Sequence, residues 1–270
     1  MTLEEIAGVQ VSVDCSGSGT PALIFVHGGA CDRHDWDAQR QALSPRFRIV
    51  TADMPGHGES GPPAAADIET LAQAVCEIKA RYGGDASVLV GHSMGCRFVL
   101  EAFRQSRSGV VGLVFVDGSY FADERAADAV QEKIRTMGAE QFLELTFGQM
   151  FLPTSDPVLR RRMISKTRGW NPEFILSMIR WDAREAPRVV ASVNIPVLVL
   201  QSSYLDGDFN RRSLKAGMTT PWTELVTRRV PDAELRIVSG VGHFAQIEAA
   251  EVVSQYIGEF AERLRLEAVQ

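Results

Sequence analysis

The stretch that decides the fold is Val88-Leu89-Val90-Gly91-His92-Ser93-Met94-Gly95. It runs from an apolar, β-branched segment into the pattern Gly-x-Ser-x-Gly, and residues 96–103 then carry apolar side chains at helical spacing. This order of strand, tight turn and helix is typical of a nucleophile elbow, which holds a serine hydroxyl out into a pocket. Gly91 and Gly95 suit the close approach of strand and helix, because they lack a Cβ. We therefore predict that Ser93 is a nucleophile; an incidental serine in a glycine-rich turn is disfavoured by the flanking strand and helix.

Strand-like runs recur along the chain, with helix-like stretches between most of them. The runs span residues 9–14, 22–26, 47–51, 87–90, 111–116, 196–201 and 234–238. Several are continuously apolar, as expected for parallel strands that are covered on both faces. We also expect a helix over 68–82, with Asp67 as N-cap and Gly83 as C-cap, and a long closing helix over 244–264. The pattern predicts an α/β fold with a doubly wound, mostly parallel sheet, whose ligands collect beyond the carboxyl ends of the strands.

Residues 121–190 break this rhythm, because they contain no strand-like run and only helical patterning rich in large apolar residues. A helical insertion between two strands would lie above the strand ends as a cap. We therefore predict an α/β core made of 1–120 and 191–270, with 121–190 as the inserted cap. Most of its large apolar side chains are expected to form the cap's own core rather than touch a ligand. They are Met137, Phe142, Phe147, Met150, Phe151, Met163, Trp170, Phe174, Met178 and Trp181.

Composition narrows the class of protein. The chain of 270 residues has a net charge of −6, and its basic residues are scattered apart from Arg160-Arg161-Arg162, which we expect to form a solvated helix face. There is therefore no electrostatic signature for a nucleic-acid partner. The N-terminus lacks the apolar segment of a secretion signal, and no stretch approaches about 18 consecutive apolar residues, so we expect a cytoplasmic protein without a membrane partner. The sequence leaves monomer and homodimer open.

The cysteines argue against a zinc site or a disulfide framework, because they lie far apart without a Cys-x-x-Cys pair. They are Cys15, Cys31, Cys76 and Cys96. Cys96 follows Ser93 by three residues, and we expect it to be a small packing residue rather than a second nucleophile.

A serine hydroxyl becomes a good nucleophile only when a base takes its proton, so a histidine must reach Ser93. His243 is the best placed, since it follows the run 234–238 through a glycine-containing loop and precedes the last helix. It therefore lies at the same edge of the sheet as Ser93. The other histidines have structural explanations, and none is a good metal ligand because no second ligand lies at a suitable spacing. They are His27, His34, His57 and His92.

The third catalytic group is a carboxylate that fixes the tautomer of the histidine. Asp206 is our first choice, because it follows the run 196–201 and precedes His243 in the chain. Asp208, two residues further on, and Asp117, which ends the run 111–116, remain alternatives.

Acyl transfer also requires donors for the negative charge that develops on the carbonyl oxygen. The expected donors are two backbone N–H groups. One belongs to Met94, directly after Ser93, and the other to Gly29, in the loop after the run 22–26.

With these segments the chain resembles the α/β-hydrolase superfamily over nearly its whole length. The matching segments are Phe25-Val26-His27-Gly28-Gly29, Asp53-Met54-Pro55-Gly56-His57-Gly58-Glu59-Ser60, Gly91-His92-Ser93-Met94-Gly95 and Gly240-Val241-Gly242-His243-Phe244. The order Ser93, Asp206, His243 matches the superfamily order of nucleophile, acid and base. The chain departs from the pattern in two places. Cys96 stands where members often have a glycine, and Asp206 lies about one residue late for the usual Gly-x-x-Asp loop, which keeps Asp117, where some members have their acid, in contention.

The resemblance also implies a function. A serine at position 93 argues against haloalkane dehalogenases and epoxide hydrolases, which have an aspartate there. We expect a serine hydrolase, without a metal or organic cofactor, that cleaves a small or medium hydrophobic carboxylic ester or lactone through an acyl-serine intermediate. Alternatives on this fold are a carbon–carbon bond hydrolase, a haloperoxidase-like perhydrolase and, in a different class, a non-catalytic small-molecule receptor.

Overall fold

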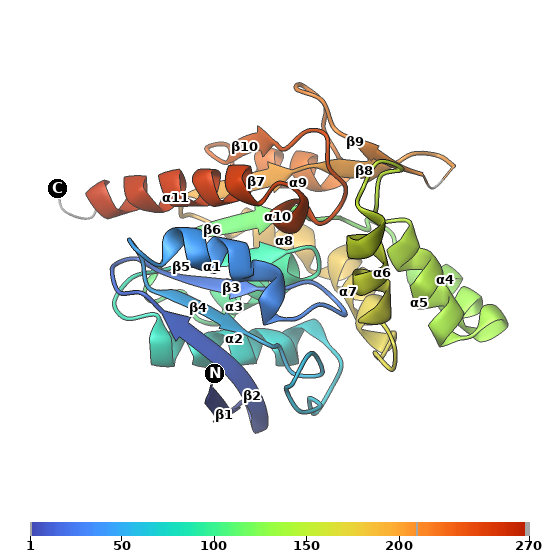
Figure 1. Ribbon diagram of the computed structural model, residues 1–270, viewed down its shortest axis with the longest axis horizontal. Coiled ribbons are helices and arrows are strands. Elements are labelled where there is room, and N and C mark those ends of the chain that lie inside the picture. Colours follow the sequence, from blue (N-terminus) through green and yellow to red (C-terminus); the bar gives the residue numbers. More distant parts are fainter. Residues whose placement is uncertain (1, 209, 268–270) are drawn as a thin grey trace.

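The computed structural model describes residues 2–208 and 210–267, and its central element is an eight-stranded sheet with helices on both faces (Figure 1). The strand order is β1-β2-β4-β3-β5-β6-β7-β10, in which neighbours from β4 to β10 are parallel and β2 is antiparallel to β1 and β4. The strands are β1 (Thr2–Ile6), β2 (Val9–Ser16), β3 (Ala22–Val26), β4 (Ile49–Ala52), β5 (Ser87–His92), β6 (Val110–Val116), β7 (Val197–Gln201) and β10 (Glu234–Ile237). The helices around the sheet are η1 (Arg33–Trp36), α1 (Asp37–Leu43), α2 (Ile68–Tyr82), α3 (Gly95–Gln105), α8 (Ala186–Ala191), α9 (Pro221–Arg229), α10 (Ala245–Glu248) and α11 (Ala250–Glu267).

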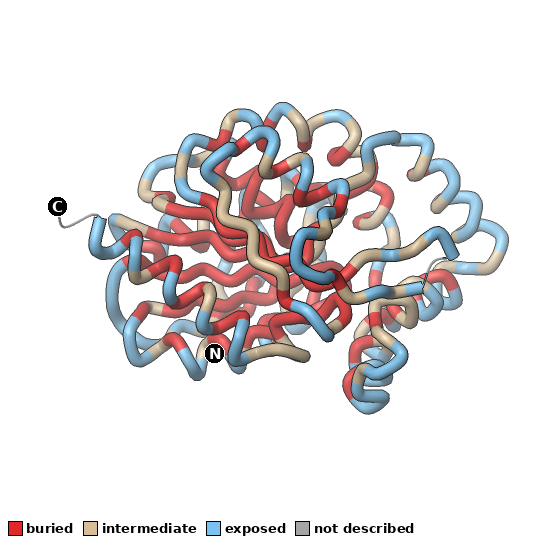
Figure 2. The backbone as a smooth tube through the Cα atoms, turned by 90° about the horizontal axis from the view of Figure 1, so that it is seen from above, coloured by how far each residue is buried: buried red, intermediate tan, exposed pale blue. Residues whose placement is uncertain are grey.

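The central strands are apolar throughout because both faces of the sheet are covered. In β3, Leu23 and Phe25 belong to the core on one face, while Ile24 and Val26 belong to the core on the other. Helices α1 and α11 cover the first face, and α2 and α3 cover the second. Figure 2 shows the buried residues concentrated in the strands between these layers. The predicted α/β class with a mostly parallel sheet is therefore confirmed.

Most predicted elements agree with the structure to within two residues. β3 and α2 have the predicted bounds, and the Asp67 carboxylate caps α2 by accepting a hydrogen bond from the N–H of Thr70. The expectation of one closing helix over 244–264 is wrong, because α10 and α11 are separated at Ala249, whose backbone is not helical. Strand β1 is not predicted by the sequence, since three of its five side chains are exposed and no apolar pattern marks it.

The chain between β6 and β7 forms five helices and, within this described span, no strand. Four of them are α4 (Arg125–Met137), α5 (Ala139–Gly148), α6 (Pro157–Ser165) and α7 (Glu173–Arg184). These four lie beyond the carboxyl ends of the central strands (Figure 1), whereas α8 packs against α3 and α9 in the core. We call α4–α7 with their connecting loops the helical insertion. The division into a core of 1–120 and 191–270 and a cap of 121–190 stays a prediction.

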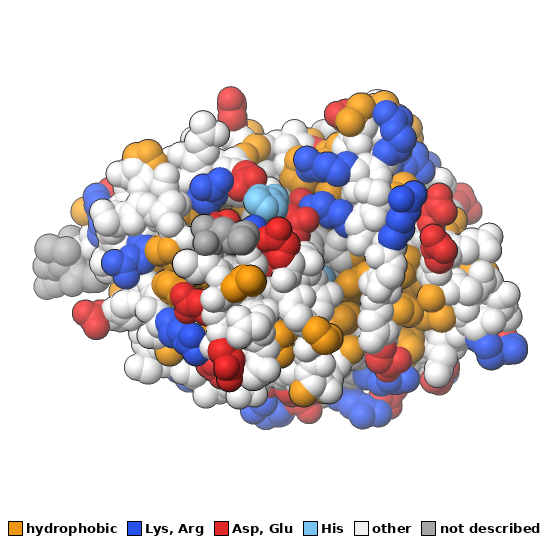
Figure 3. Space-filling view, turned by 60° about the horizontal axis from the view of Figure 1, so that its bottom comes forward, with side chains coloured by type: hydrophobic (Ala, Val, Ile, Leu, Met, Phe, Trp, Pro, Cys, Tyr) orange, Lys and Arg blue, Asp and Glu red, His pale blue; other side chains and the backbone are white. Residues whose placement is uncertain are grey.

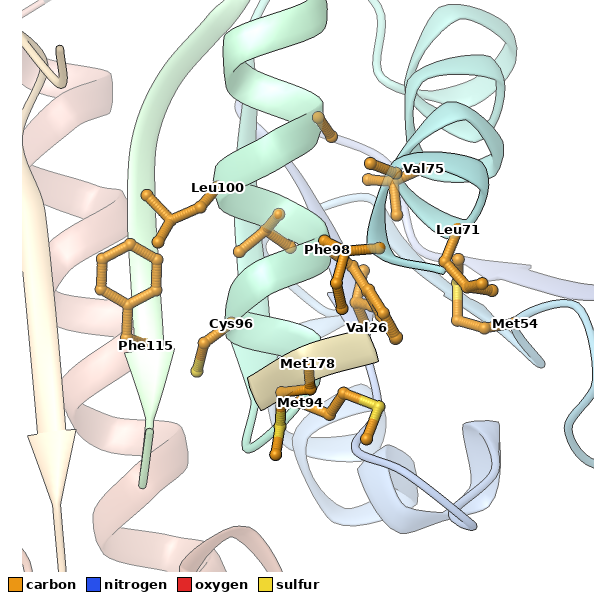
Figure 4. Packing of buried hydrophobic residues seen from close by; sticks show 14 of the residues in the cluster. Val26, Met54, Leu71, Val75, Met94, Cys96, Phe98, Leu100, Phe115 and Met178 are labelled. Carbon is orange, nitrogen blue, oxygen red and sulfur yellow. The ribbon is translucent and has the colours of Figure 1, made fainter. Parts of the chain in front are cut away.

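Helix α3 is the element that anchors the predicted elbow, and it is packed on both sides. In Figure 4, Phe98 of α3 faces Val75 of α2, while Leu100 lies beside Phe115 of β6. Met178 of α7 reaches the same cluster at the N-terminal end of α3. The start of α3 is therefore held by the core and by the helical insertion together.

Among the described residues, no helix combines the length and the apolar composition needed to cross a bilayer. In Figure 3, hydrophobic side chains gather on the side where the helical insertion lies, and charges of both signs are spread over the rest of that face. Arg160, Arg161 and Arg162 are exposed on α6, as expected.

Candidate active site

Three side chains from the ends of three strands form one chain of hydrogen bonds. Nε2 of His243 accepts a hydrogen bond from the Ser93 hydroxyl at 2.7 Å, and Nδ1 donates one to Oδ2 of Asp117 at 2.7 Å. Ser93 follows β5, Asp117 follows β6, and His243 lies in the loop after β10. Asp117 and His243 are buried, while Ser93 is partly exposed. In this geometry an imidazole can take a proton from a hydroxyl while a carboxylate fixes its tautomer.

Ser93 lies on a strained turn that the surrounding backbone enforces. Its φ of +54° is in the left-handed region, which is unfavourable for a residue with a Cβ. A Cβ on Gly91 would lie 2.5 Å from the carbonyl oxygen of Gly95, and a Cβ on Gly95 would lie 2.6 Å from that of Val26. The N–H of Ser93 donates to the carbonyl of Val116 at 3.0 Å. The close approach predicted for the two glycines is therefore present.

Asp117 is fixed by donors on both oxygens. Its Oδ1 accepts hydrogen bonds from the N–H groups of Ser202 at 2.7 Å and Ser203 at 3.1 Å, and from the side-chain amide of Gln201 at 2.9 Å. The Ser203 hydroxyl donates to Oδ2 at 3.0 Å, beside His243. Burial raises the pKa of Asp117, but the hydrogen bond and charge of His243 and the backbone donors outweigh burial and hold that pKa below its ordinary value. The carboxylate is therefore charged at neutral pH.

The expected pairing of Asp206 with His243 is wrong. Asp206 lies in the turn of a hairpin made of β8 (Ser203–Leu205) and β9 (Arg211–Ser213), where its Oδ2 accepts a hydrogen bond from Arg212 at 2.7 Å. Asp208 is exposed in the same turn. The chain enters this hairpin directly after β7, and the hairpin carries both carboxylates away from the histidine. Asp117, the alternative, has the position beside His243 because it ends the strand between β5 and β7.

The loop that carries His243 is held from two sides. The backbone N–H of His243 donates to the carbonyl of Met150 in the helical insertion at 2.9 Å. The backbone carbonyl of His243 accepts a hydrogen bond from Nε2 of His92 at 2.9 Å. Burial lowers the pKa of His92 to about 3, so that this ring is a neutral structural donor. Core and helical insertion therefore position the histidine together.

His243 is neutral and available as a base. Burial lowers the pKa of His243 by more than the hydrogen bond and charge of Asp117 raise it, and the positive charges of Arg211 and Arg97 lower it further. A neutral imidazole that accepts a hydrogen bond from a hydroxyl can accept its proton during a reaction.

Two backbone donors without partners lie beside Ser93. In the part of the chain that the structure describes, no group accepts a hydrogen bond from the N–H of Gly29 or of Met94. Both residues line the same cavity as Ser93. Met94 is the N-cap of α3, where the helix dipole favours negative charge. Such a pair can stabilise a negatively charged oxygen, and its role as an oxyanion hole stays a prediction.

The three side chains open into a cavity of about 370 Å³ between the core and the helical insertion. Of the large apolar side chains considered above, four line this cavity, namely Phe147, Met150, Trp170 and Met178. The other six pack in or against the hydrophobic core, as expected for most of them. The cavity therefore suits a small or medium ligand with apolar parts.

The other histidines in glycine-containing loops have structural partners. Nε2 of His27 accepts a hydrogen bond from the N–H of Met54, and Nε2 of His57 accepts one from the indole N–H of Trp170, both at 2.9 Å. Cys96 is buried, and burial raises the pKa of its thiol to about 12, which keeps it unreactive. It packs beneath the elbow, as predicted.

Sequence reasoning missed the groups that support the three side chains. Ser202 and Ser203 are marked only by their position directly after β7, the strand beside Asp117. Arg97, which donates to the carbonyl of Ser93 at 3.0 Å, and Arg211 in the cavity wall carry no sequence signal at all.

Comparison with known proteins gives relatives of several activities. A dihydrolipoyllysine-residue acetyltransferase component of the acetoin cleaving system from Pseudomonas putida is 24% identical over 260 residues, which are 92% of this chain and 65% of that protein. The chain thus spans less than two thirds of that relative. A solved thermophilic esterase from Thermogutta terrifontis has a TM-score of 0.79 at 23% identity, covering 98% of this chain and 99% of that one. The enol-lactonase from Burkholderia xenovorans LB400 has a TM-score of 0.77 at 17% identity, covering 96% of this chain and 99% of that one.

The family model is more decisive, because it takes in most of the chain. The model described as the alpha/beta hydrolase family matches residues 23–255. That span begins in β3, includes the elbow and the helical insertion, and ends in α11 after His243. With this match and the mostly parallel sheet described above, the chain belongs to the alpha/beta hydrolase family.

Proposed function

We propose that this protein is a serine hydrolase that cleaves a small or medium carboxylic ester or lactone. In this proposal Ser93 is the nucleophile, His243 the general base and Asp117 the carboxylate that orients the histidine. The observation that carries it is the pair of 2.7 Å hydrogen bonds that join the hydroxyl, the imidazole and the carboxylate. Membership of the alpha/beta hydrolase family and the likeness of the fold to an esterase and an enol-lactonase support the same class.

The first half-reaction forms an acyl-serine. Oγ of Ser93 attacks the carbonyl carbon while its proton passes to Nε2 of His243. The carbonyl oxygen becomes negative and accepts hydrogen bonds from the N–H groups of Gly29 and Met94. The bond to the leaving alkoxide then breaks, and His243 gives its proton to that oxygen. Asp117 keeps Nδ1 protonated and stabilises the imidazolium.

The second half-reaction releases the acid. Water attacks the acyl carbon while His243 takes one of its protons, and the same two N–H groups stabilise the oxygen. The bond to Oγ of Ser93 breaks and the serine recovers its proton from His243. The scheme uses only groups of this chain and water, so no metal or organic cofactor enters it.

The proposal is tested with p-nitrophenyl acetate, butyrate and octanoate and with a fluorophosphonate probe that labels activated serines. We expect the wild-type protein to be labelled and to hydrolyse at least the shorter esters. Ser93→Ala should lose the label and lower kcat by at least about 10³-fold. Ser165→Ala, at an exposed serine of α6, is the matched control and should retain both.

Other outcomes point to the alternatives. Wild-type protein that neither labels nor hydrolyses any ester would overturn the proposal and favour a small-molecule receptor. Cleavage of a coloured dienoate without ester hydrolysis would favour a carbon–carbon bond hydrolase, and peracid formation from acetate and peroxide without ester hydrolysis would favour a perhydrolase.

A further inference from the structure

A single positive charge lies in the wall of the active-site cavity. Arg211 of β9 is the only lysine or arginine among the described residues that line this cavity. Its Nε donates to the carbonyl of Gln149 at 3.2 Å, and no described carboxylate lies within 4.0 Å of its guanidinium. Its two terminal nitrogens therefore have no acceptor among the described residues. An arginine in such a place has hydrogen-bonding capacity that the described part of the chain does not use.

The neighbouring arginine shows that this arrangement is specific to position 211. Arg212 is exposed and donates to the carboxylate of Asp206 at 2.7 Å. Arg211, in contrast, is partly buried and lines the cavity. Because side chains alternate along a strand, these two arginines of β9 point to opposite sides of the hairpin. The hairpin thus presents one arginine to its own aspartate and the other to the cavity.

Burial of an unpaired cation is unfavourable, so its presence calls for an explanation. Burial lowers the pKa of Arg211 and the negative charge of Asp117 raises it, and the guanidinium stays protonated at neutral pH. Asp117 is not its ion-pair partner, because that carboxylate is bound by His243 and by Ser203. The charge of Arg211 nevertheless reaches the reacting groups, since it acts on the pKa of both Asp117 and His243.

The missing partner has a defined chemistry. A guanidinium with two free terminal nitrogens matches a carboxylate in a bidentate pair, and one cation balances one negative charge. The remaining wall is mostly apolar, with Met150, Leu205 and Trp222 among its members. A ligand that fits this cavity therefore has an apolar body and one anionic group.

We propose that Arg211 binds a carboxylate of the substrate, so that the ester or lactone which this protein cleaves carries a free carboxylate away from the scissile bond. This inference rests on the proposed hydrolase function, because it names the substrate class of the same site. It predicts that the enzyme discriminates between charged and neutral esters of similar size, and that Arg211 is the source of that discrimination.

The kinetic test compares three esters of similar length. Ethyl butyrate is neutral, monoethyl glutarate carries a carboxylate in its acyl half, and butyryl glycolate carries one in its alcohol half. We expect kcat/KM to be at least about tenfold higher for one of the two anionic esters than for ethyl butyrate, as a charge-assisted bidentate pair would give. We call the quotient of these two kcat/KM values, anionic over neutral ester, the ratio. Arg211→Met should lower the ratio by about 10- to 100-fold. The ratio is the readout because loss of the charge also changes the pKa of His243, which affects all three esters alike.

Two further variants keep the kinetic test falsifiable. Arg211→Lys retains the charge without the bidentate geometry and should lower the ratio by less than Arg211→Met. Arg212→Met is the matched control from the same strand and should leave the ratio unchanged, since its side chain pairs with Asp206. The inference is overturned if the wild-type enzyme prefers ethyl butyrate to both anionic esters, or if Arg211→Met leaves the ratio as it was.

A binding test separates failure of this inference from failure of the proposed hydrolase function. Glutarate should raise the melting temperature of the Ser93→Ala protein, in which catalysis is removed, and should not do so when Arg211→Met is added. If no ester is hydrolysed but glutarate binds through Arg211, the hydrolase proposal falls and the carboxylate site stands. If esters are hydrolysed and glutarate stabilises the two proteins equally, the carboxylate site falls and the hydrolase proposal stands.

Discussion

Arg97 of α3 and Asp182 of α7 form an ion pair in which neither side chain is exposed to solvent. The Arg97 guanidinium donates to the two carboxylate oxygens at 2.9 and 2.6 Å, and it also donates to the carbonyl of Ser93 at 3.0 Å. Asp182 accepts a further hydrogen bond from the N–H of Phe121 at 3.1 Å, where the chain leaves β6 for the helical insertion. The pair thus joins the helical insertion to the backbone of the elbow, and we regard Arg97 as a positioning residue.

Replacing one member of this ion pair should destabilise the protein more than replacing both members. Asp182→Leu leaves the Arg97 charge buried without a counterion, and we expect a loss of about 3–5 kcal/mol in the free energy of unfolding. The double variant Arg97→Met, Asp182→Leu should recover much of that loss, because no uncompensated charge remains. Urea unfolding of the wild type, both single variants and the double variant measures the coupling. Strictly additive effects would show that the two side chains act independently.

Asp117 and Asp206 should differ sharply as catalytic carboxylates. Asp117→Asn removes the acceptor that fixes the Nδ1–H tautomer of His243, and we expect kcat for p-nitrophenyl butyrate to fall by about 10⁴-fold. Asp206→Asn breaks only a pair with exposed Arg212, so its kcat should stay close to that of the wild type. Steady-state kinetics of both purified variants provides the measurement. A collapse of activity in the Asp206 variant alone would restore the assignment that the sequence favours.

The activity should survive to mildly acidic pH. The acid limb of kcat/KM reports the pKa of the free enzyme's base, which burial of His243 places below the ordinary value of about 6.5. Arg211 lowers this pKa, so Arg211→Met should move the acid limb toward higher pH. Measuring kcat/KM for p-nitrophenyl butyrate from about pH 4 to about pH 8, for the wild type and for Arg211→Met, tests both points. A wild-type limb centred above 6.5, or a limb of the variant that moves toward lower pH, would disagree with this account.

The elbow should not tolerate a methyl group at Gly91. A Cβ there would lie 2.5 Å from backbone, which cannot move without shifting the turn that holds Ser93. We expect Gly91→Ala to lose at least about 1–3 kcal/mol of stability and most of its activity. Gly207→Ala is the control, because a Cβ at Gly207 meets no heavy atom of the described residues within 4 Å. Thermal unfolding and ester hydrolysis of the two variants decide the point, and an equally active Gly91→Ala protein would argue against a rigid elbow.

The parts of this protein that follow from local pattern could be predicted from its sequence. The apolar runs that became β3, β5, β6 and β7 are buried on both faces, so their composition alone marks them as strands. Ser93 and His243 could be selected as candidate site residues from local pattern as well. Each lies in a glycine-containing turn or loop that follows a strand-like run, at the carboxyl edge of the sheet.

The carboxylate that lies beside His243 could not be predicted in the same way, because its identity depends on strand order rather than on local pattern. The run before Asp206 and the run before Asp117 look alike in sequence. What separates them is that β6 lies between β5 and β7, while the chain after β7 turns into a hairpin. The partners of Arg97 and the isolation of Arg211 are likewise tertiary facts, since each depends on residues far away in the chain.

In the proposed reaction, Ser93 carries the acyl group during turnover and is activated by His243. Acid-quenching the protein within milliseconds of mixing with p-nitrophenyl butyrate, followed by peptide mass spectrometry, locates the butyryl group. We predict that the group is found on the peptide containing Ser93 and that His243→Ala abolishes its formation. A butyryl group on another residue, or hydrolysis that proceeds with no acylated peptide in either protein, would contradict the account.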